Sequence, residues 1–265
     1  MRLSGWKLPL DHISATSLAH AAQCPEKWRH RYLLREPESF SVNGFIGTVD
    51  HLTIERSLRD KMDNGVVWGA DEIARAYGQA WHDTIERESD IRWGDTPEEE
   101  VFSLGTLMAQ TYQEQVGQYL RPSSIEERFS ERVKGVPIPI TGRIDLTTFM
   151  GIVERKTTHQ KVSTPRATWR MQARVYQLVA PLEIQWQITT RQKTPQVHIG
   201  SELMPGLIMQ PQNADVTANF IRQVVSTLDF FYTRYGPDEP WPTLGIYSDW
   251  ACNYCSWKPD CVAWS

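Results

Sequence analysis

Alternating apolar and polar residues predict two short strands near the middle of the chain, joined by a tight turn at 149–151. The first strand covers about 138–148 and separates apolar from polar residues (Ile140, Gly142, Ile144 and Leu146 against Arg143, Asp145 and Thr147). The second covers about 151–157 and directs Glu154 and Lys156 to one face, because strand residues two apart point the same way. If the strands pair as a hairpin, Asp145 comes near Glu154 across the ladder.

The apolar spacing on either side of this hairpin is mostly helical. Before the hairpin we expect a strand at 125–133, a loop at 37–43, and helices at 18–22, 26–34, 45–58, 71–88 and 97–119. After it we expect a helix that opens at Pro165, strands at 183–190 and beyond Pro195, and a long amphipathic helix at 213–235. Residues from 240 onward are rich in loop-forming residues. The pattern predicts a mixed α/β (α+β) chain.

Two carboxylates and an ammonium group would share a small space in the hairpin. Close carboxylates repel one another unless a proton or a divalent cation lies between them. Hard cations such as Mg²⁺ and Mn²⁺ prefer carboxylate oxygens. Lys156 could orient or activate a water molecule there, or neutralise charge that develops on a phosphate. The alternative is an ordinary cross-strand ion pair on a surface hairpin, because the Glu-x-Lys triplet is common.

Two predicted helices carry further polar candidates. His51 lies in the helix at 45–58, with Glu55 one turn later on the same face. The alternative for His51 is a structural role. Gln172 and Tyr176 are four residues apart in the helix after Pro165 and share a face. The alternative for this pair places Tyr176 in the core and Gln172 in solvent.

Length and charge narrow the classes of protein that fit. A chain of 265 residues can bury a sizeable core in one large domain. The net charge of −4 excludes a protein that is basic throughout, but between Arg121 and Gly200 there are 13 Lys and Arg against 6 Asp and Glu. Such a segment suits a polyanionic substrate, with a solvated basic face as the alternative. No apolar run is long enough to cross a bilayer, and the N-terminus lacks a secretory signal. We therefore expect a cytoplasmic protein without a membrane partner.

The four cysteines form one candidate site. Cys24 lies near the start, and Cys252, Cys255 and Cys261 form a C-x2-C-x5-C cluster near the end. In an intracellular protein disulfides are not the default, whereas four thiolates suit zinc or an iron–sulfur cluster, which spacing alone does not separate. Cysteines without metal are the alternative. A shared site would clamp the two ends of the chain together and stabilise the fold. The cluster loop also carries three tryptophans that we expect to shield it rather than to stack on unpaired bases: Trp250, Trp257 and Trp264.

Six short motifs occur in a recognisable order along the chain. They are S-A-T-S-L-A-H-A-A-Q-C-P near the N-terminus, G-T-V-D-H at 47–51, G-R-I-D at 142–145, E-R-K at 154–156, Q-A-R-V-Y at 172–176 and C-x2-C-x5-C at the end. Together they resemble the RecB-like branch of the PD-(D/E)XK nuclease superfamily. The likeness is strongest to its iron–sulfur exonucleases, which include CRISPR-adaptation nucleases and AddB-type repair subunits. Ile144 stands where the superfamily name has proline, a position that varies in such proteins.

The resemblance implies a restriction-endonuclease-like fold, in which helices flank a central mixed sheet. It also implies a single domain over 1–265. Within this domain, 1–36 and 240–265 would form an iron–sulfur lobe that clamps the N- and C-terminal segments together. A largely helical region would cover 45–120, and the catalytic sheet core would cover 121–210.

The resemblance further implies roles for matching residues. A divalent cation would be bound by His51, Asp145, Glu154 and the backbone carbonyl of Arg155. An imidazole ligand favours Mn²⁺ somewhat over Mg²⁺. Lys156 would position or activate the attacking water, and Gln172 and Tyr176 would complete the catalytic site and contact the substrate strand. A [4Fe-4S] cluster would be held by Cys24, Cys252, Cys255 and Cys261.

The expected function is that of a Mg²⁺- or Mn²⁺-dependent DNA exonuclease. It would hydrolyse phosphodiester bonds of single-stranded or end-bearing DNA in recombination, repair, or phage- or CRISPR-type DNA processing. The chain has no Walker-type G-x-x-x-x-G-K-[ST] motif, so a helicase partner would be a separate chain, as would recombination proteins. The alternative is a catalytically silent, cluster-stabilised DNA-binding subunit of a larger complex. The intact set of Asp145, Glu154 and Lys156 argues against this alternative.

Overall fold

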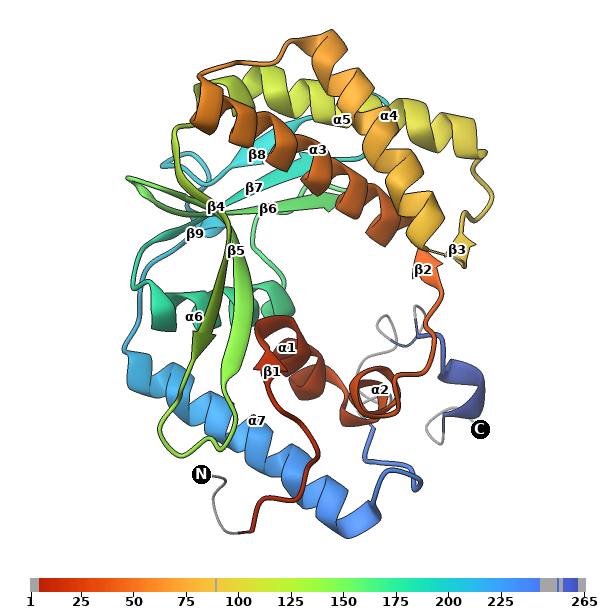
Figure 1. Cartoon of the computed structure of the whole chain (residues 1–265), viewed down its shortest axis with the longest axis vertical. Coiled ribbons are helices and arrows are strands. Elements are labelled where there is room, and N and C mark those ends of the chain that lie inside the picture. The colour runs from red at the N-terminus through yellow and green to blue at the C-terminus, as the bar shows by residue number, and fades with distance from the viewer. Residues whose placement is uncertain (1–4, 89, 244–251, 253–254, 262–265) are drawn as a thin grey trace.

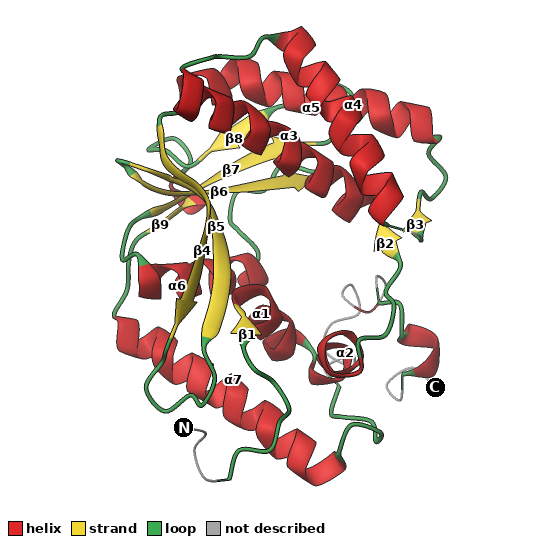
Figure 2. Ribbon diagram, in the orientation of Figure 1, coloured by secondary structure: helices red, strands yellow, loops and turns green. Residues whose placement is uncertain are grey.

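A strongly twisted mixed sheet with helices on both faces organises the molecule (Figure 1, Figure 2). The structure is a computed structural model and describes residues 5–88, 90–243, 252 and 255–261. Within these residues the sheet has seven strands. Strands β1, β5, β6, β7 and β8 lie side by side in that order, β4 pairs with β5, and β9 pairs with β7. The expected central mixed sheet flanked by helices is confirmed.

The first half of the chain is mainly helical. Its elements are β1 Ile13–Ser14, α1 Ala15–Gln23, α2 Pro25–Trp28, a π-helix Arg29–Leu34, β2 Phe40–Ser41, α3 Val42–Asn64, α4 Ala70–Arg87, β3 Ile91–Arg92, α5 Glu98–Gln115 and a 3₁₀ turn Gly117–Tyr119. Ser14 caps α1 by accepting a hydrogen bond from the Ser17 amide, as the position of a serine before an apolar-periodic segment predicts. The expected helices are therefore confirmed, and 26–34 is divided between α2 and the π-helix.

The second half supplies every strand of the described seven-stranded sheet except β1, together with further helices that cover the lower part of that sheet in Figure 1. Its elements are β4 Pro122–Glu131, β5 Ile140–Thr148, β6 Gly151–Thr158, α6 Ala167–Val179, β7 Ile184–Thr190, β8 Val197–Ile199, a 3₁₀ turn Pro205–Leu207, β9 Ile208–Met209, α7 Ala214–Tyr235 and a 3₁₀ turn Lys258–Asp260. The hairpin of β5 and β6 is confirmed, with Leu146 opposite Val153 and Thr148 opposite Gly151.

Two hydrophobic cores lie on the two faces of the sheet. One joins α1, α6 and α7 to the sheet through residues such as Leu18, Tyr176 and Ile221. The other joins α3, α4 and α5 to it through residues such as Phe45 and Tyr112. The sheet is therefore covered by helices on both faces and held from both sides. None of the helices in the described residues is long and apolar enough to span a membrane.

The expected loop at 37–43 is wrong in part. Phe40–Ser41 forms β2, which pairs in parallel with β3 at Ile91–Arg92, and α3 already begins at Val42. Ser41 caps α3 by accepting a hydrogen bond from the Gly44 amide. The pairing partner of β2 lies far along the chain, and a pattern read in a short window does not reveal it.

Candidate functional site

A gap in the pairing of β5 creates the candidate site. One edge of β5 pairs with β4 along its length, whereas the other pairs with β1 at Ile140 and Thr141 and with β6 only from Leu146 onward. Between these contacts β5 and β6 diverge, as Figure 1 shows. Asp145 lies in this gap, where its Oδ2 accepts a hydrogen bond of 3.1 Å from the backbone amide of Arg155. The Asp145 carboxylate thus replaces a backbone hydrogen bond that the separated strands do not form, and it points into the opening between them.

Helix α3 delivers His51 to the same opening. Its Nε2 lies 3.1 Å from the carbonyl oxygen of Arg155, and its Nδ1 lies 3.7 Å from Oδ2 of Asp145. Burial lowers the pKa of His51 and outweighs the opposing effect of Asp145. The imidazole is therefore neutral near pH 7, the form in which histidine binds metals.

A buried ion pair holds α3 in this position. Asp50 accepts a hydrogen bond of 2.6 Å from Arg155, and both side chains are buried. The guanidinium of Arg155 also lies 4.2 Å from the centre of the Tyr112 ring. Gly47 lies one turn before His51, where an added Cβ atom would come within 3.2 Å of the Thr157 hydroxyl on β6. A larger residue would therefore crowd this helix–strand contact. The G-T-V-D-H motif thus supplies a close helix–strand contact at Gly47, a buried ion pair at Asp50 and the imidazole of His51.

Glu154 and Lys156 lie side by side on β6, as the hairpin pattern predicts. Lys156 Nζ is 2.6 Å from Oε1 of Glu154, and only 1% of the Glu154 side chain is exposed. Burial and the nearby Asp145 carboxylate raise the pKa of Glu154 to about 7. Burial alone would lower the pKa of Lys156, but the carboxylates of Glu154 and Asp145 outweigh it and raise that pKa. Lys156 is therefore a cation that neutralises part of a dense negative site.

Glu126 is a site residue that the sequence reasoning missed. It lies on β4 between Ile125 and Glu127, which pair with Leu146 and Ile144, so it stands across from Asp145. Its φ of 53° is rare for a residue other than glycine. Burial and the charge of Asp145 raise its pKa to about 7. The adjacent glutamates 126 and 127 look alike in the sequence, and only the backbone conformation turns one of them inward.

The donor atoms at this opening fit a divalent cation. Ligand atoms of His51, Glu126 and Asp145 all lie within 4.8 Å of one another. In the described part of the chain, Glu154 Oε2 is buried without a hydrogen-bond partner, which is costly unless a cation or proton satisfies it. Carboxylate oxygens with one imidazole suit Mg²⁺ or Mn²⁺. Glu154 is not one of these three residues, and its Oε1 lies 2.6 Å from Lys156 Nζ.

A cavity of about 590 Å³ leads away from Asp145. Gln172 and Tyr176 of α6 line it, and Gln172 Nε2 donates a hydrogen bond of 2.6 Å to the Tyr176 hydroxyl. Gly142 contributes to its floor, where a Cβ atom would clash with the ring of Phe129. Phe129 in turn packs edge-on against Tyr176 at 5.9 Å. The G-R-I-D and Q-A-R-V-Y motifs thus face each other across one groove that ends at the carboxylates.

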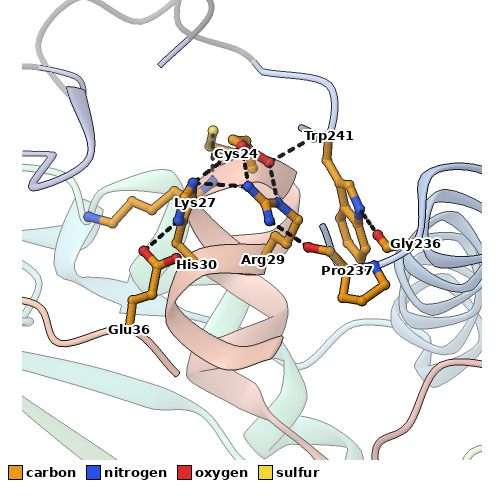
Figure 3. A network of polar contacts seen from close by, with 9 residues as sticks. Cys24, Lys27, Arg29, His30, Glu36, Gly236, Pro237 and Trp241 are labelled. Carbon is orange, nitrogen blue, oxygen red and sulfur yellow. Dashed lines mark hydrogen bonds and ion pairs between the residues drawn. The ribbon is translucent and has the colours of Figure 1, made fainter. Parts of the chain in front are cut away.

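A network of polar contacts joins the N-terminal helices to the C-terminal segment (Figure 3). Arg29 binds Glu26 at 2.8 Å and donates to the carbonyl of Pro237 at 2.6 Å. The backbone amide of Trp241 donates to Glu26 at 2.7 Å, and its ring stacks on Trp28. Direct protein contacts therefore hold these two ends of the chain together.

Three of the four cysteines, Cys24, Cys255 and Cys261, come together beside this network. Cys24 caps α2, where its sulfur accepts a hydrogen bond of 3.5 Å from the Lys27 amide. Burial and the nearby Cys24 and Cys261 raise the pKa of the Cys255 thiol, so these three thiols lie within electrostatic reach of one another. Trp257 is buried and stacks on His30, with 5.3 Å between the ring centres. The predictions for Trp250 and Trp264 concern residues outside the described ranges.

Comparisons with known proteins agree with this geometry. Residues 12–262 match the family model of the PD-(D/E)XK nuclease superfamily. The structure of the protein SSO0001 is 14% identical, with 94% of this chain and 95% of that chain covered and a TM-score of 0.37. A proposed exonuclease from Eubacterium rectale is 14% identical, with 93% and 91% covered and a TM-score of 0.44. These two scores are too low to add to the family match. No curated protein matches the chain significantly.

Proposed function

The chain belongs to the PD-(D/E)XK nuclease superfamily, and from this premise we propose that it is a Mg²⁺- or Mn²⁺-dependent DNA exonuclease. The proposal rests above all on the convergence of His51, Glu126 and Asp145 within 4.8 Å, beside the pair of Glu154 and Lys156. Such a set of carboxylates, imidazole and ammonium suits phosphodiester hydrolysis better than a merely structural role.

Each residue has a distinct task in this proposal. A bound divalent cation supplies charge that stabilises the phosphorane-like transition state. Asp145, Glu154, His51 and the carbonyl of Arg155 would hold that cation, joined by Glu126. Lys156 positions the attacking water and stabilises the charge that grows on the phosphate. Its ammonium lies 6.0 Å from the centre of the Trp169 ring, which restricts where it can move.

The substrate in this proposal is a single strand or a strand end that enters the groove. Gln172 and Tyr176 line the groove and would contact the strand that enters it. Tyr176 is 2% exposed, and burial raises its pKa well above the usual range, so the hydroxyl stays protonated. It therefore acts as a neutral contact and not as a base. Recombination, repair or phage- or CRISPR-type DNA processing would use such an activity, with a helicase supplied by another chain.

Digestion of end-labelled DNA tests the proposed function directly. With Mn²⁺ or Mg²⁺ the purified protein is expected to shorten single-stranded DNA progressively from one end, and EDTA is expected to stop the reaction. Strands labelled at either end, and a circular single strand without ends, reveal polarity and separate exonuclease from endonuclease cutting. If the protein cuts DNA with none of the divalent cations tested, the proposed nuclease activity is contradicted, and a catalytically silent DNA-binding subunit becomes the better explanation.

We further propose that Cys24, Cys252, Cys255 and Cys261 hold a [4Fe-4S] cluster in a lobe formed by 1–36 and 240–265. The proximity of three of the thiols and the polar network beside them support a shared site. Clustered thiolates suit iron–sulfur clusters and zinc alike. The cluster would lock contacts that already join both ends of the chain, so its role would be structural.

Replacing Cys255 by alanine tests the cluster. Anaerobically purified wild-type protein is expected to be brown and to contain iron and sulfide, whereas Cys255→Ala should lose the colour and unfold several degrees lower, because metal binding contributes to folding. Ser256→Ala is the matched control in the same loop, since Ser256 is not a proposed ligand and its hydroxyl accepts a 3.3 Å hydrogen bond from Arg92. A colourless, zinc-containing wild-type protein would refute the iron–sulfur assignment.

A further inference from the structure

Strands β4 and β5 carry an unusual set of charges beside the proposed metal site. Arg128 lies directly opposite Arg143 in the antiparallel ladder, and Glu126 stands across from Asp145. Like charges that face each other across a ladder destabilise the pair unless something of opposite charge lies between them. A cation would meet this condition for the two carboxylates, and an anion would meet it for the two arginines.

The arginines are open to solvent and face the groove. Both line the cavity of about 590 Å³ that begins at Asp145 and is also lined by Thr16 and Gln172. The Arg143 side chain is 56% exposed, and its Nε forms an ion pair of 2.5 Å with Oε2 of Glu126. Arg128 is exposed and has no carboxylate partner in the described part of the chain. The carboxylate that pairs with Arg143 thus belongs to the proposed metal set.

We propose that Arg128 and Arg143 form a phosphate-binding subsite for the DNA strand, and that metal binding releases Arg143 to fill it. The inference rests on the proposed function, because it assigns the metal and the DNA to neighbouring halves of one charged ladder. The planar fork of arginine binds phosphate oxygens in pairs. The phosphate is either an internal one, next to the bond that is cut, or a terminal one at the end of the strand.

The coupling follows from the shared residue Glu126. In the metal-free protein Glu126 neutralises Arg143. A cation that binds the Glu126 carboxylate frees the guanidinium of Arg143. The cation and the freed guanidinium then both add positive charge to the groove. Because coupling between two ligands is reciprocal, the cation strengthens DNA binding and DNA strengthens cation binding by the same factor. Arg143 therefore links the two events, because it pairs with Glu126 in the metal-free protein and with the DNA phosphate once the cation has bound.

Binding without cleavage tests the subsite. Fluorescence anisotropy with a labelled single-stranded oligonucleotide is measured in Ca²⁺ and in EDTA, with a 5′-phosphate or a 5′-hydroxyl. In Ca²⁺ we expect Arg143→Ala and Arg128→Ala each to weaken binding about tenfold, and Arg143→Lys to restore part of the loss. Arg75→Ala is the matched control: it breaks a 2.8 Å surface pair with Glu72 on α4, outside the groove, and should bind like the wild type. A loss confined to 5′-phosphorylated strands identifies a terminal phosphate, and a loss on both strands identifies an internal one.

Two further readouts isolate the coupling. Calcium is expected to strengthen DNA binding of the wild type clearly more than that of Arg143→Ala. In titration calorimetry with Mn²⁺ alone, Arg143→Ala should bind the cation more tightly, because Glu126 no longer has to leave a partner. Equal DNA affinities of Arg143→Ala and the wild type would overturn the subsite. Equal calcium effects in the two proteins would overturn the release of Arg143.

These outcomes are distinguishable from failure of the proposed function. If the variants lose DNA binding as expected but the wild type cuts nothing with Mg²⁺ or Mn²⁺, the phosphate-binding subsite is supported and the proposed nuclease activity is refuted. If the wild type cuts DNA and the variants bind as tightly as it does, the nuclease activity is supported and the subsite is refuted. If the wild type does not bind DNA at all, both proposals are refuted.

Discussion

Replacing Asp145 by asparagine is expected to lower the rate of DNA hydrolysis about 10³-fold while leaving the fold intact. The amide oxygen of asparagine can still accept the 3.1 Å hydrogen bond from the Arg155 amide. The substitution, however, removes the negative charge of a carboxylate that lies 3.7 Å from His51 and within 4.8 Å of the ligand atom of Glu126. The measurements are the single-turnover rate on end-labelled single-stranded DNA with Mn²⁺, Mn²⁺ affinity by calorimetry, and DNA affinity in Ca²⁺.

The matched control for this change is Glu127→Gln. Glu127 is exposed on the neighbouring strand β4, next to Glu126, and its substitution removes one negative charge without altering the site. It should keep the wild-type rate and Mn²⁺ affinity. Asp145→Asn protein that cuts DNA at the wild-type rate would show that this carboxylate does not hold the cation.

Asp50→Ala is expected to destabilise the protein by about 3–5 kcal/mol, because it leaves the guanidinium of Arg155 buried without its counter-charge. Asp50 is 1% exposed and binds Arg155 at 2.6 Å. The same pair fixes α3 on β6, so the variant should also lose activity through displacement of His51 at temperatures where it remains folded. Equilibrium unfolding in urea gives the free energy of unfolding.

An exposed pair that also involves α3 provides the control for Asp50. Arg56 binds Asp83 of α4 at 2.7 Å, with both side chains more than a third exposed. Exposed ion pairs contribute little, so Asp83→Ala should change the unfolding free energy only slightly. Asp50→Asn keeps the shape of the side chain, and its loss of unfolding free energy should lie between those of Asp50→Ala and Asp83→Ala. It takes the place of Asp50→Ala if that variant is too unstable to purify. A loss for Asp50→Ala no larger than that for Asp83→Ala would contradict the role of the buried pair.

The raised pKa values of Glu126 and Glu154 decide the pH at which the variants are compared. Glu126 and Glu154 each have a pKa of about 7 without a cation. Both must lose their protons to bind a metal, so metal affinity rises with pH through neutrality. Rates and affinities of variants are therefore compared at one fixed pH above 7.

Strong local patterns predicted most of the fold. The β5–β6 hairpin, the helix with Gln172 and Tyr176, and the long α7 all show clear periodicity, and the structure confirms each of them. The expected loop at 37–43 is wrong in part, because β2 depends on a partner at Ile91–Arg92. Long-range strand pairing leaves little trace in a short window of sequence.

The candidate site shows the same division. Residue types and motif order were enough to single out Asp145, Glu154, Lys156 and His51, because carboxylates, imidazole and ammonium limit the possible chemistry. Only the tertiary structure placed Glu126 opposite Asp145 and gave it a left-handed backbone. It also assigned the side chain of Arg155 to a buried pair with Asp50, where sequence reasoning had used only its carbonyl.

The sequence by itself therefore determined the elements and the chemical character of this protein, since both depend on local periodicity and on residue type. The tertiary structure alone decided which charges meet. It opened the edge of β5 between β1 and β6, and it paired Glu126 with Arg143 in a groove that starts at Asp145. The physical reason is that the energy of a charge depends on burial and on neighbours a few ångströms away, and the folded chain draws those neighbours from distant parts of the sequence.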